Sequence, residues 1–110
     1  MAQNSAVLIC GEQEDGKITA ITKELLGAGK ILAGVLNGQL NALIIGSNIQ
    51  DCGEEAIFYG ADKVCLVDDP SLSKYYPDRY TAAITQACHQ IEPSVVLLGH
   101  TTMGRELAVR

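Results

Sequence analysis

Four short runs of apolar residues are spaced along the chain, and none of them alternates with polar residues. Strands that are apolar on both faces are typical of parallel sheets whose two faces are covered by helices. The pattern therefore predicts four parallel strands that are buried on both faces. These strands correspond to residues 6–10, 42–45, 64–67 and 95–98.

The segment between the first two runs has the period of a helix. Thr19 is a suitable N-cap, and Asp15-Gly16 is a turn before it. Gly29 falls on the apolar stripe of this helix, where it is expected to let the helix approach the sheet closely. The predicted stripe consists of Ile18, Ile21, Leu25, Leu32 and Leu36.

Two further helices are predicted between the later runs. The first covers residues 47–59. Ser47 opens a capping-box sequence, and Gly60 can adopt the left-handed backbone conformation that commonly ends a helix. Its inner stripe is expected to be Ile49, Cys52, Ala56 and Tyr59. A loop with one helical turn at residues 72–75 leads to the next helix. The apolar face of that helix is formed by Tyr80, Ala83, Ile84, Ala87, Cys88 and Ile91.

The strands and helices alternate, and a further helix begins at Thr101. This order predicts the α/β class, with an open parallel sheet of order 3-2-1-4 and helices on both faces. Residues 104–110 read as the first two turns of the last helix, and no residue there would end it. We therefore expect residues 1–110 to form a single domain, truncated within this helix, from a longer chain.

Composition limits the classes of function. The chain has 110 residues, and 8 Lys+Arg against 13 Asp+Glu give a net charge of −5, which disfavours nucleic-acid binding. No apolar run approaches the roughly 20 residues that cross a bilayer, so membrane insertion is not expected. Residues 1–5 lack the basic segment of a signal peptide, which makes the cytoplasm the expected location.

The four cysteines are Cys10, Cys52, Cys65 and Cys88, and no two of them form a Cys-x-x-Cys pair. Zinc-ribbon and thioredoxin-type sites are therefore not indicated, and four free thiols are expected. Cys52 lies near a helix N-terminus, where thiol pKa values fall. Because it also belongs to the inward stripe, we interpret it as a small core residue rather than as the thiol of an enzyme.

A ligand crevice is predicted where the strand order reverses, between the first and fourth strands. Cys10-Gly11-Glu12 and residues 99–105 follow the carboxyl ends of these strands. Thr101 and Thr102 offer hydroxyls and a helix cap, and Arg105 can add a charge-assisted hydrogen bond to an anion. A phosphate or cofactor role is therefore one interpretation of these three residues, and an ordinary capped helix start is the other.

Other candidate residues indicate no catalytic or metal site. His89 is expected to face water, and His100 stands at a strand end without a carboxylate partner in sequence reach. Asp68-Asp69-Pro70 is interpreted as a turn that ends a strand rather than as a metal site. The sequence contains neither a Walker A motif nor a Gly-x-Gly-x-x-Gly motif, and no Ser-His-Asp or Cys-His arrangement is recognisable.

Five stretches in order resemble the amino-terminal domain of the electron transfer flavoprotein alpha subunit, and together they span essentially the whole chain. The most specific runs from Leu97 to Ala108. The sequence departs from the family at Glu106, often Asp, at Val109, often Pro, and at His100, usually a smaller residue. The five stretches are residues 14–18, 24–28, 59–64, 67–70 and 97–108.

The resemblance implies a heterodimer of alpha and beta subunits that carries electrons through FAD from acyl-CoA or other dehydrogenases to an acceptor. It implies an adenine-nucleotide-binding, alpha-hydrolase-like fold that serves as scaffold and docking domain, not as an enzyme. FAD would be held mainly by a carboxyl-terminal domain that is absent here, so this chain alone would be inactive and bind no cofactor tightly. Thr101, Thr102 and Arg105 match the family segment close to the nucleotide or flavin of the beta subunit.

Two alternatives stay open. The chain can be a stand-alone adenine-nucleotide-binding module, because universal stress proteins share the sheet order. A truncated sheet also exposes an edge, through which two copies of the chain can associate.

Overall fold

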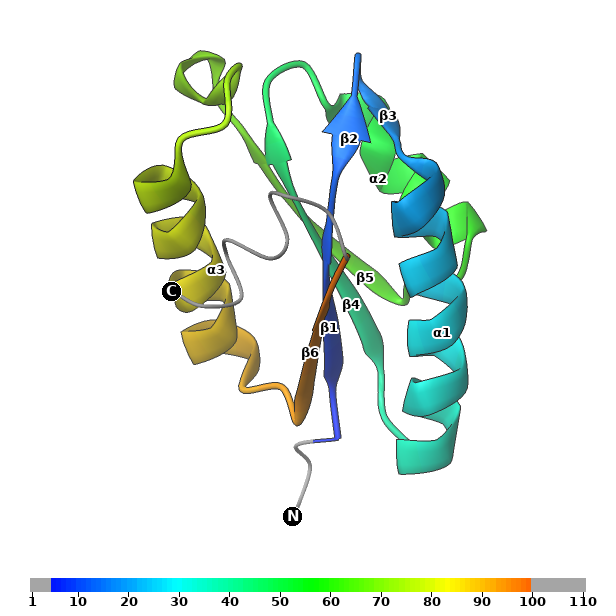
Figure 1. The fold of residues 1–110 in the computed structure, drawn as a ribbon. Coiled ribbons are helices and arrows are strands. Elements are labelled where there is room, and N and C mark those ends of the chain that lie inside the picture. Colours follow the sequence, from blue (N-terminus) through cyan, green and yellow to red (C-terminus); the bar gives the residue numbers. More distant parts are fainter. Residues whose placement is uncertain (1–4, 100–110) are drawn as a thin grey trace.

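The computed structural model describes residues 5–99, which form one parallel sheet with helices on both faces (Figure 1). The strand order is β5-β4-β1-β6, so the predicted order 3-2-1-4 and the α/β class are confirmed. The strands are β1 (Val7–Gly11), β4 (Leu40–Gly46), β5 (Lys63–Asp68) and β6 (Val95–Leu98). The helices are α1 (Ala20–Leu36), α2 (Gln50–Phe58) and α3 (Pro77–Ile91).

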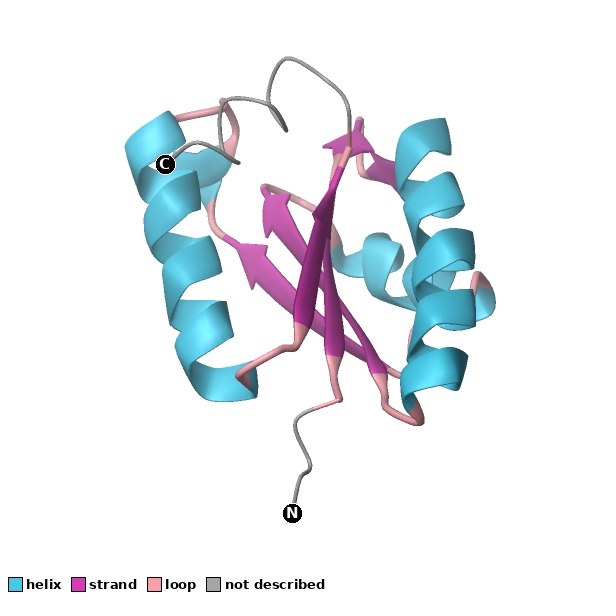
Figure 2. Cartoon of the chain, turned by 60° about the horizontal axis from the view of Figure 1, so that its bottom comes forward, coloured by secondary structure: helices cyan, strands magenta, loops and turns pink. Residues whose placement is uncertain are grey.

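Side chains from alternate residues of the strands point to opposite faces of the sheet, where they form two apolar layers. Val7 and Ile9 of β1 belong to the layer under α1 and α2, and Leu8 belongs to the layer under α3. Figures 1 and 2 show these two helices on one side of the sheet and α3 on the other. Strand β1 is central, since Val7 pairs with Leu40 of β4 and with Val95 of β6.

Burial of the four strands differs from the prediction at the sheet edges. Every residue of β4 is buried, as are four of the five in β1. By contrast, Cys65 of β5 is exposed, and Val96 of β6 is 37% exposed. The expectation of burial on both faces was wrong for these two strands because they are the outer strands of the described sheet, where helices cover them less completely.

Helix α1 begins as predicted, because the hydroxyl of Thr19 accepts a hydrogen bond from the Thr22 backbone. The close approach at Gly29 is also confirmed: a Cβ there would lie 2.7 Å from Leu40 Cδ1. The predicted stripe was wrong by about one position, however. Leu25 and Leu32 only flank the core, and the residues that face it are Thr22, Leu26, Gly29 and Ala33.

Helix α2 begins at Gln50, three residues later than predicted, and the capping box at Ser47 does not form. The carboxylate of Asp68 accepts the backbone N–H groups of Asn48 at 2.8 Å and Ile49 at 3.2 Å. Gly60 ends the segment with φ +123°, as expected. Of the predicted inner stripe, Ile49, Cys52 and Ala56 are fully buried, whereas Tyr59 is 39% exposed.

Three smaller features complete the described chain. The α3 face matches the prediction, with Tyr80 and Ala87 buried and the rest of that stripe packed against the same layer. The helical turn before it, η1 (Pro70–Leu72), is a 3-10 turn that lies slightly earlier than expected. A hairpin that the sequence did not predict, β2 (Gln13–Glu14) and β3 (Lys17–Ile18), follows β1.

No helix within residues 5–99 is long and apolar enough to cross a membrane. The predicted start of a further helix at Thr101 lies outside the described residues.

Candidate functional site

The strand ends at which a crevice is predicted, those of β1 and β6, are neighbours in the sheet. Cys10 pairs with Leu98, so the chain after Gly11 and the chain after Leu98 leave the sheet side by side. Gly99 is buried at this point. The residues proposed to contact a cofactor, Thr101, Thr102 and Arg105, and also His100, lie outside the described residues.

A buried hydroxyl fixes the backbone directly after β1. Thr22 Oγ1 accepts a hydrogen bond from the Glu12 backbone N–H at 2.7 Å and lies 2.8 Å from the Glu12 carbonyl oxygen, to which it can donate. It also lies 2.9 Å from Thr19 Oγ1. A Cβ at Gly11 would lie 3.0 Å from Thr22 Cγ2, so glycine allows this close approach. The hydroxyl of Thr22 thus holds the backbone in place instead of facing a ligand.

The β2–β3 hairpin covers the carboxyl end of β4. Its turn has positive φ at Asp15 (53°) and Gly16 (80°), as in a type I′ turn. The Cys52 thiol donates to the Gly16 carbonyl oxygen at 3.3 Å, and Glu55 accepts the Ile18 N–H at 3.0 Å. The sequence indicated this turn through Asp15-Gly16. The two strands beside it have two residues each, which is too short to show the alternation of polar and apolar residues that predicts a strand.

Beneath the hairpin tip lies a polar cavity of about 400 Å³. No Lys or Arg lines it, and the nearby N–H groups of Asn48 and Ile49 are already donated to Asp68. The Ser71 backbone N–H lowers the pKa of the Asp69 carboxyl, which keeps negative charge at this edge of the sheet. The cavity therefore suits a neutral polar or cationic group better than a phosphate. Its lining residues are Gln13, Asp15, Gly16, Ser47, Asn48 and Ser73.

Cys52 is fully buried, which confirms its interpretation as a small core residue. Burial raises the pKa of its thiol to about 11, and the nearby carboxylates of Glu55 and Asp51 add to this. Burial also raises the pKa of Cys10 to about 12. Both thiols are therefore neutral at physiological pH, and neither is an activated nucleophile. All four cysteines are free, as predicted.

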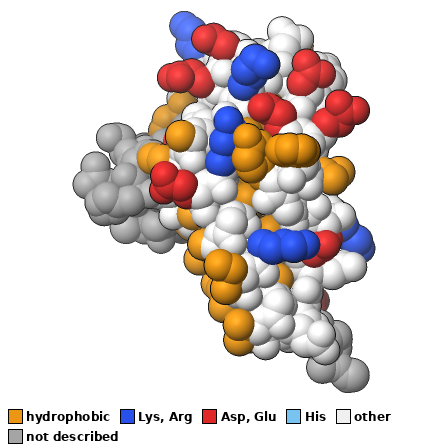
Figure 3. Space-filling model, turned by 90° about the vertical axis from the view of Figure 1, so that its right-hand side faces the viewer, with side chains coloured by type: hydrophobic (Ala, Val, Ile, Leu, Met, Phe, Trp, Pro, Cys, Tyr) orange, Lys and Arg blue, Asp and Glu red, His pale blue; other side chains and the backbone are white. Residues whose placement is uncertain are grey.

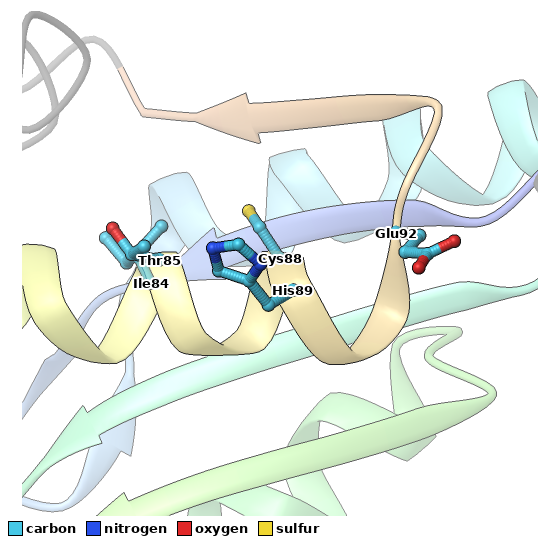
Figure 4. Close-up of a pocket in the computed structure, with 5 residues that line it drawn as sticks. All are labelled: Ile84, Thr85, Cys88, His89 and Glu92. Carbon is cyan, nitrogen blue, oxygen red and sulfur yellow. The ribbon is translucent and has the colours of Figure 1, made fainter.

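A second hollow, of about 340 Å³, lies beside α3 (Figure 4). Its lining comes from one helix and the residue that follows it, and Figure 4 shows Thr85 and Cys88 on the side turned toward β6. His89 is exposed there, as predicted. In the part of the chain that the structure describes, no three His, Cys, Asp or Glu side chains could hold a metal ion.

The fold defines an open parallel α/β domain of the universal stress protein type. The structure of a universal stress protein from Archaeoglobus fulgidus matches with a TM-score of 0.64 over 96% of this chain and 86% of that one, at 8% sequence identity, so the likeness concerns the fold alone. The family is given by the sequence. Residues 7–110 match the electron transfer flavoprotein domain, and the chain belongs to this family.

The relatives include electron transfer flavoprotein alpha subunits and FixB proteins, which confirms the resemblance found in the sequence. The electron transfer flavoprotein subunit alpha of Bacillus subtilis is 37% identical over 102 residues, 93% of this chain and 31% of the relative. Protein FixB of Azorhizobium caulinodans is 41% identical over 100 residues, 88% of this chain and 27% of the relative. The chain thus spans about a third or less of the length of these relatives.

Proposed function

We propose that the chain is the scaffold and subunit-docking domain of an electron transfer flavoprotein alpha subunit. In this proposal it belongs to a heterodimer with a beta subunit, and FAD carries electrons from acyl-CoA or other dehydrogenases to an acceptor. The observation that carries the proposal is the family match over residues 7–110, together with alpha-subunit relatives that align along nearly the whole chain.

The described residues support a positioning role. In a flavoprotein the cofactor supplies the redox chemistry, and the protein contributes position and local charge. The described carboxyl edge does not fit the diphosphate of FAD, because no basic side chain lines its polar cavity and the two backbone N–H groups before α2 are taken by Asp68. We therefore place the main FAD site outside this domain, and we expect the domain alone to be inactive and to hold no cofactor tightly.

The segment after Gly99 is where the domain would meet the nucleotide or flavin of the beta subunit. Thr101 and Thr102 would supply hydroxyls, and Arg105 would supply positive charge. A guanidinium beside a flavin stabilises its anionic reduced forms and so raises the potential. These three roles follow from the family resemblance and from the order of the chain, in which the segment comes directly after β6, the neighbour of β1 at the reversal of strand order.

Two experiments test the proposal. The first is co-expression of the chain with the beta subunit from the same organism, where co-purification is expected and its absence would contradict the docking role. The second replaces Arg105 by Ala in the complete heterodimer, with Lys30→Ala on exposed α1 as a control that removes the same charge. A lower flavin potential or weaker flavin binding is expected for Arg105→Ala alone, and identical reduction curves would refute its role.

Calorimetry separates this proposal from a stand-alone nucleotide-binding module. Titration of the chain alone with AMP or ATP is expected to give no heat of binding in the micromolar range. Micromolar affinity would favour the stand-alone module and overturn the scaffold role.

A further inference from the structure

Strand β5 forms one edge of the described sheet and pairs only with β4. An edge strand presents unpaired backbone groups, and proteins usually protect it with charges, proline or a bulge. The middle of β5 has none of these devices: residues 64–67 are Val-Cys-Leu-Val, and charge appears only at Lys63 and Asp68. An apolar and uncharged edge of this kind is suited to pairing with another strand.

The direction of the free backbone groups follows from one hydrogen bond. The Asp69 N–H donates to the Gly46 carbonyl oxygen at 3.0 Å, so it points toward β4. Backbone groups alternate in direction along a strand, and the register between β4 and β5 is regular from Lys63 to Asp68. The N–H and C=O groups of Val64, Leu66 and Asp68 therefore point outward from the sheet. The exposed side chain of Cys65 and the groove of about 210 Å³ between β5 and α3 show that this edge is open.

We propose that a second copy of the chain occupies this edge, with the two β5 strands antiparallel around a two-fold axis. The two sheets would then join into one. This self-association rests on the edge of β5 and not on the proposed flavoprotein function, so each can fail without the other.

Charge selects one register for this pair. Side chains directly opposite each other must lie on the same face of the sheet, so the two residue numbers of each pair must add up to an even number. A sum of 132 places Lys63 opposite Asp69 of the other copy, and Cys65 opposite Val67. A sum of 130 would instead place Asp62 opposite Asp68, which is repulsive, and a sum of 134 gives no opposite-charge pair.

In the proposed register, Val64 of one copy and Asp68 of the other form hydrogen-bonded pairs, and so do the two Leu66 residues. Each pair exchanges two backbone bonds, and Leu66 lies at the two-fold axis facing its copy. Asp69 has extended backbone (φ −150°, ψ 136°), so it continues the strand far enough to reach Lys63. The edge is therefore self-complementary in hydrogen bonds, apolar side chains and charge.

Sedimentation equilibrium of the 110-residue chain tests the proposal, with a concentration-dependent dimer as the expected result. Val64→Pro removes an N–H that points outward and makes no bond to β4, so it should abolish the dimer and preserve the circular dichroism spectrum. A chain that stays monomeric at every concentration would overturn the proposal, and so would a folded Val64→Pro variant that still dimerises.

A charge exchange keeps the test decisive if Val64→Pro does not fold. Lys63→Asp and Asp69→Lys should each weaken the homodimer about tenfold or more, because both symmetric contacts become repulsive. A mixture of the two variants should recover a heterodimer with both contacts attractive. Lys74→Asp, at an exposed position outside β5, is the control and should leave the dimer unchanged. Failure of the mixture to associate would overturn the proposed register.

Discussion

The contact between α1 and the sheet can be tested with one methyl group. A Cβ at Gly29 would lie 2.7 Å from Leu40 Cδ1 and 3.2 Å from Ile9 Cγ2, and both of these side chains are fully buried. Overpacking a filled core costs about 1–3 kcal/mol. Replacing glycine by alanine inside a helix gains about 1 kcal/mol. The net expectation for Gly29→Ala is a loss of up to about 2 kcal/mol in the free energy of unfolding.

Gly34→Ala is the matched control in the same helix. A Cβ at Gly34 would have no atom within 4 Å, so this variant should only gain the helix propensity and become about 1 kcal/mol more stable than the parent. The two variants should therefore differ by about 1–3 kcal/mol in urea unfolding, measured at protein concentrations where the chain is monomeric. Equal stability of the two variants would refute the close approach at Gly29.

A double-mutant cycle identifies the atom responsible. Leu40→Val removes the Cδ1 atom that a methyl group at Gly29 would meet. If that contact causes the loss, Gly29→Ala should cost less in the Leu40→Val background than in the parent. The same cost in both backgrounds would assign the loss to another neighbour of the helix.

Three further outcomes are expected from urea unfolding. Thr22→Val should cost about 2 kcal/mol, because the Glu12 N–H loses its acceptor, whereas Thr22→Ser, which keeps the hydroxyl, should cost less. Asp68→Ala should cost about 1 kcal/mol because the N–H groups of Asn48 and Ile49, which precede α2, lose their acceptor, and an unchanged stability would contradict that role. The free energy of unfolding should fall from about pH 9 upward, by about 1.4 kcal/mol per pH unit for each thiol, because burial raises the pKa of Cys52 to about 11 and of Cys10 to about 12. Below pH 9 this stabilisation is fully present, and Cys52→Ser should flatten the alkaline slope.

The strands and their order could be predicted because the apolar runs are unbroken. What the runs could not show was which strands form the edges of the described sheet. Val64-Cys65-Leu66-Val67 is as apolar as the central strands, yet Cys65 is exposed. Burial of a strand depends on its neighbours and on the reach of the helices, and neither property is contained in the run itself.

The errors in α1 and α2 have a common cause, which is a polar contact between distant residues. Thr22 is fully buried, but a hydrophobic pattern excludes threonine from an inward stripe, and its hydrogen bond to Glu12 joins two separate elements. The chain that enters helix α2 is held by Asp68, which is 20 residues away from Asn48, and not by a cap from the nearby Ser47. Local motifs predict local caps, so long-range contacts of this kind are found only when the fold is known.

The β2–β3 hairpin limits which of the carboxyl strand ends a partner can reach. It covers the end of β4, where Gln13 packs against Gly46 and the Cys52 thiol donates to Gly16. The cavity that remains there has no basic lining and stands beside ionised Asp69, so anionic cofactors are disfavoured on that side. The ends of β1 and β6 carry no such cover within the described chain. We therefore expect the proposed contact with an anionic nucleotide or flavin to lie at the carboxyl ends of β1 and β6, where the reversal of strand order also predicts it.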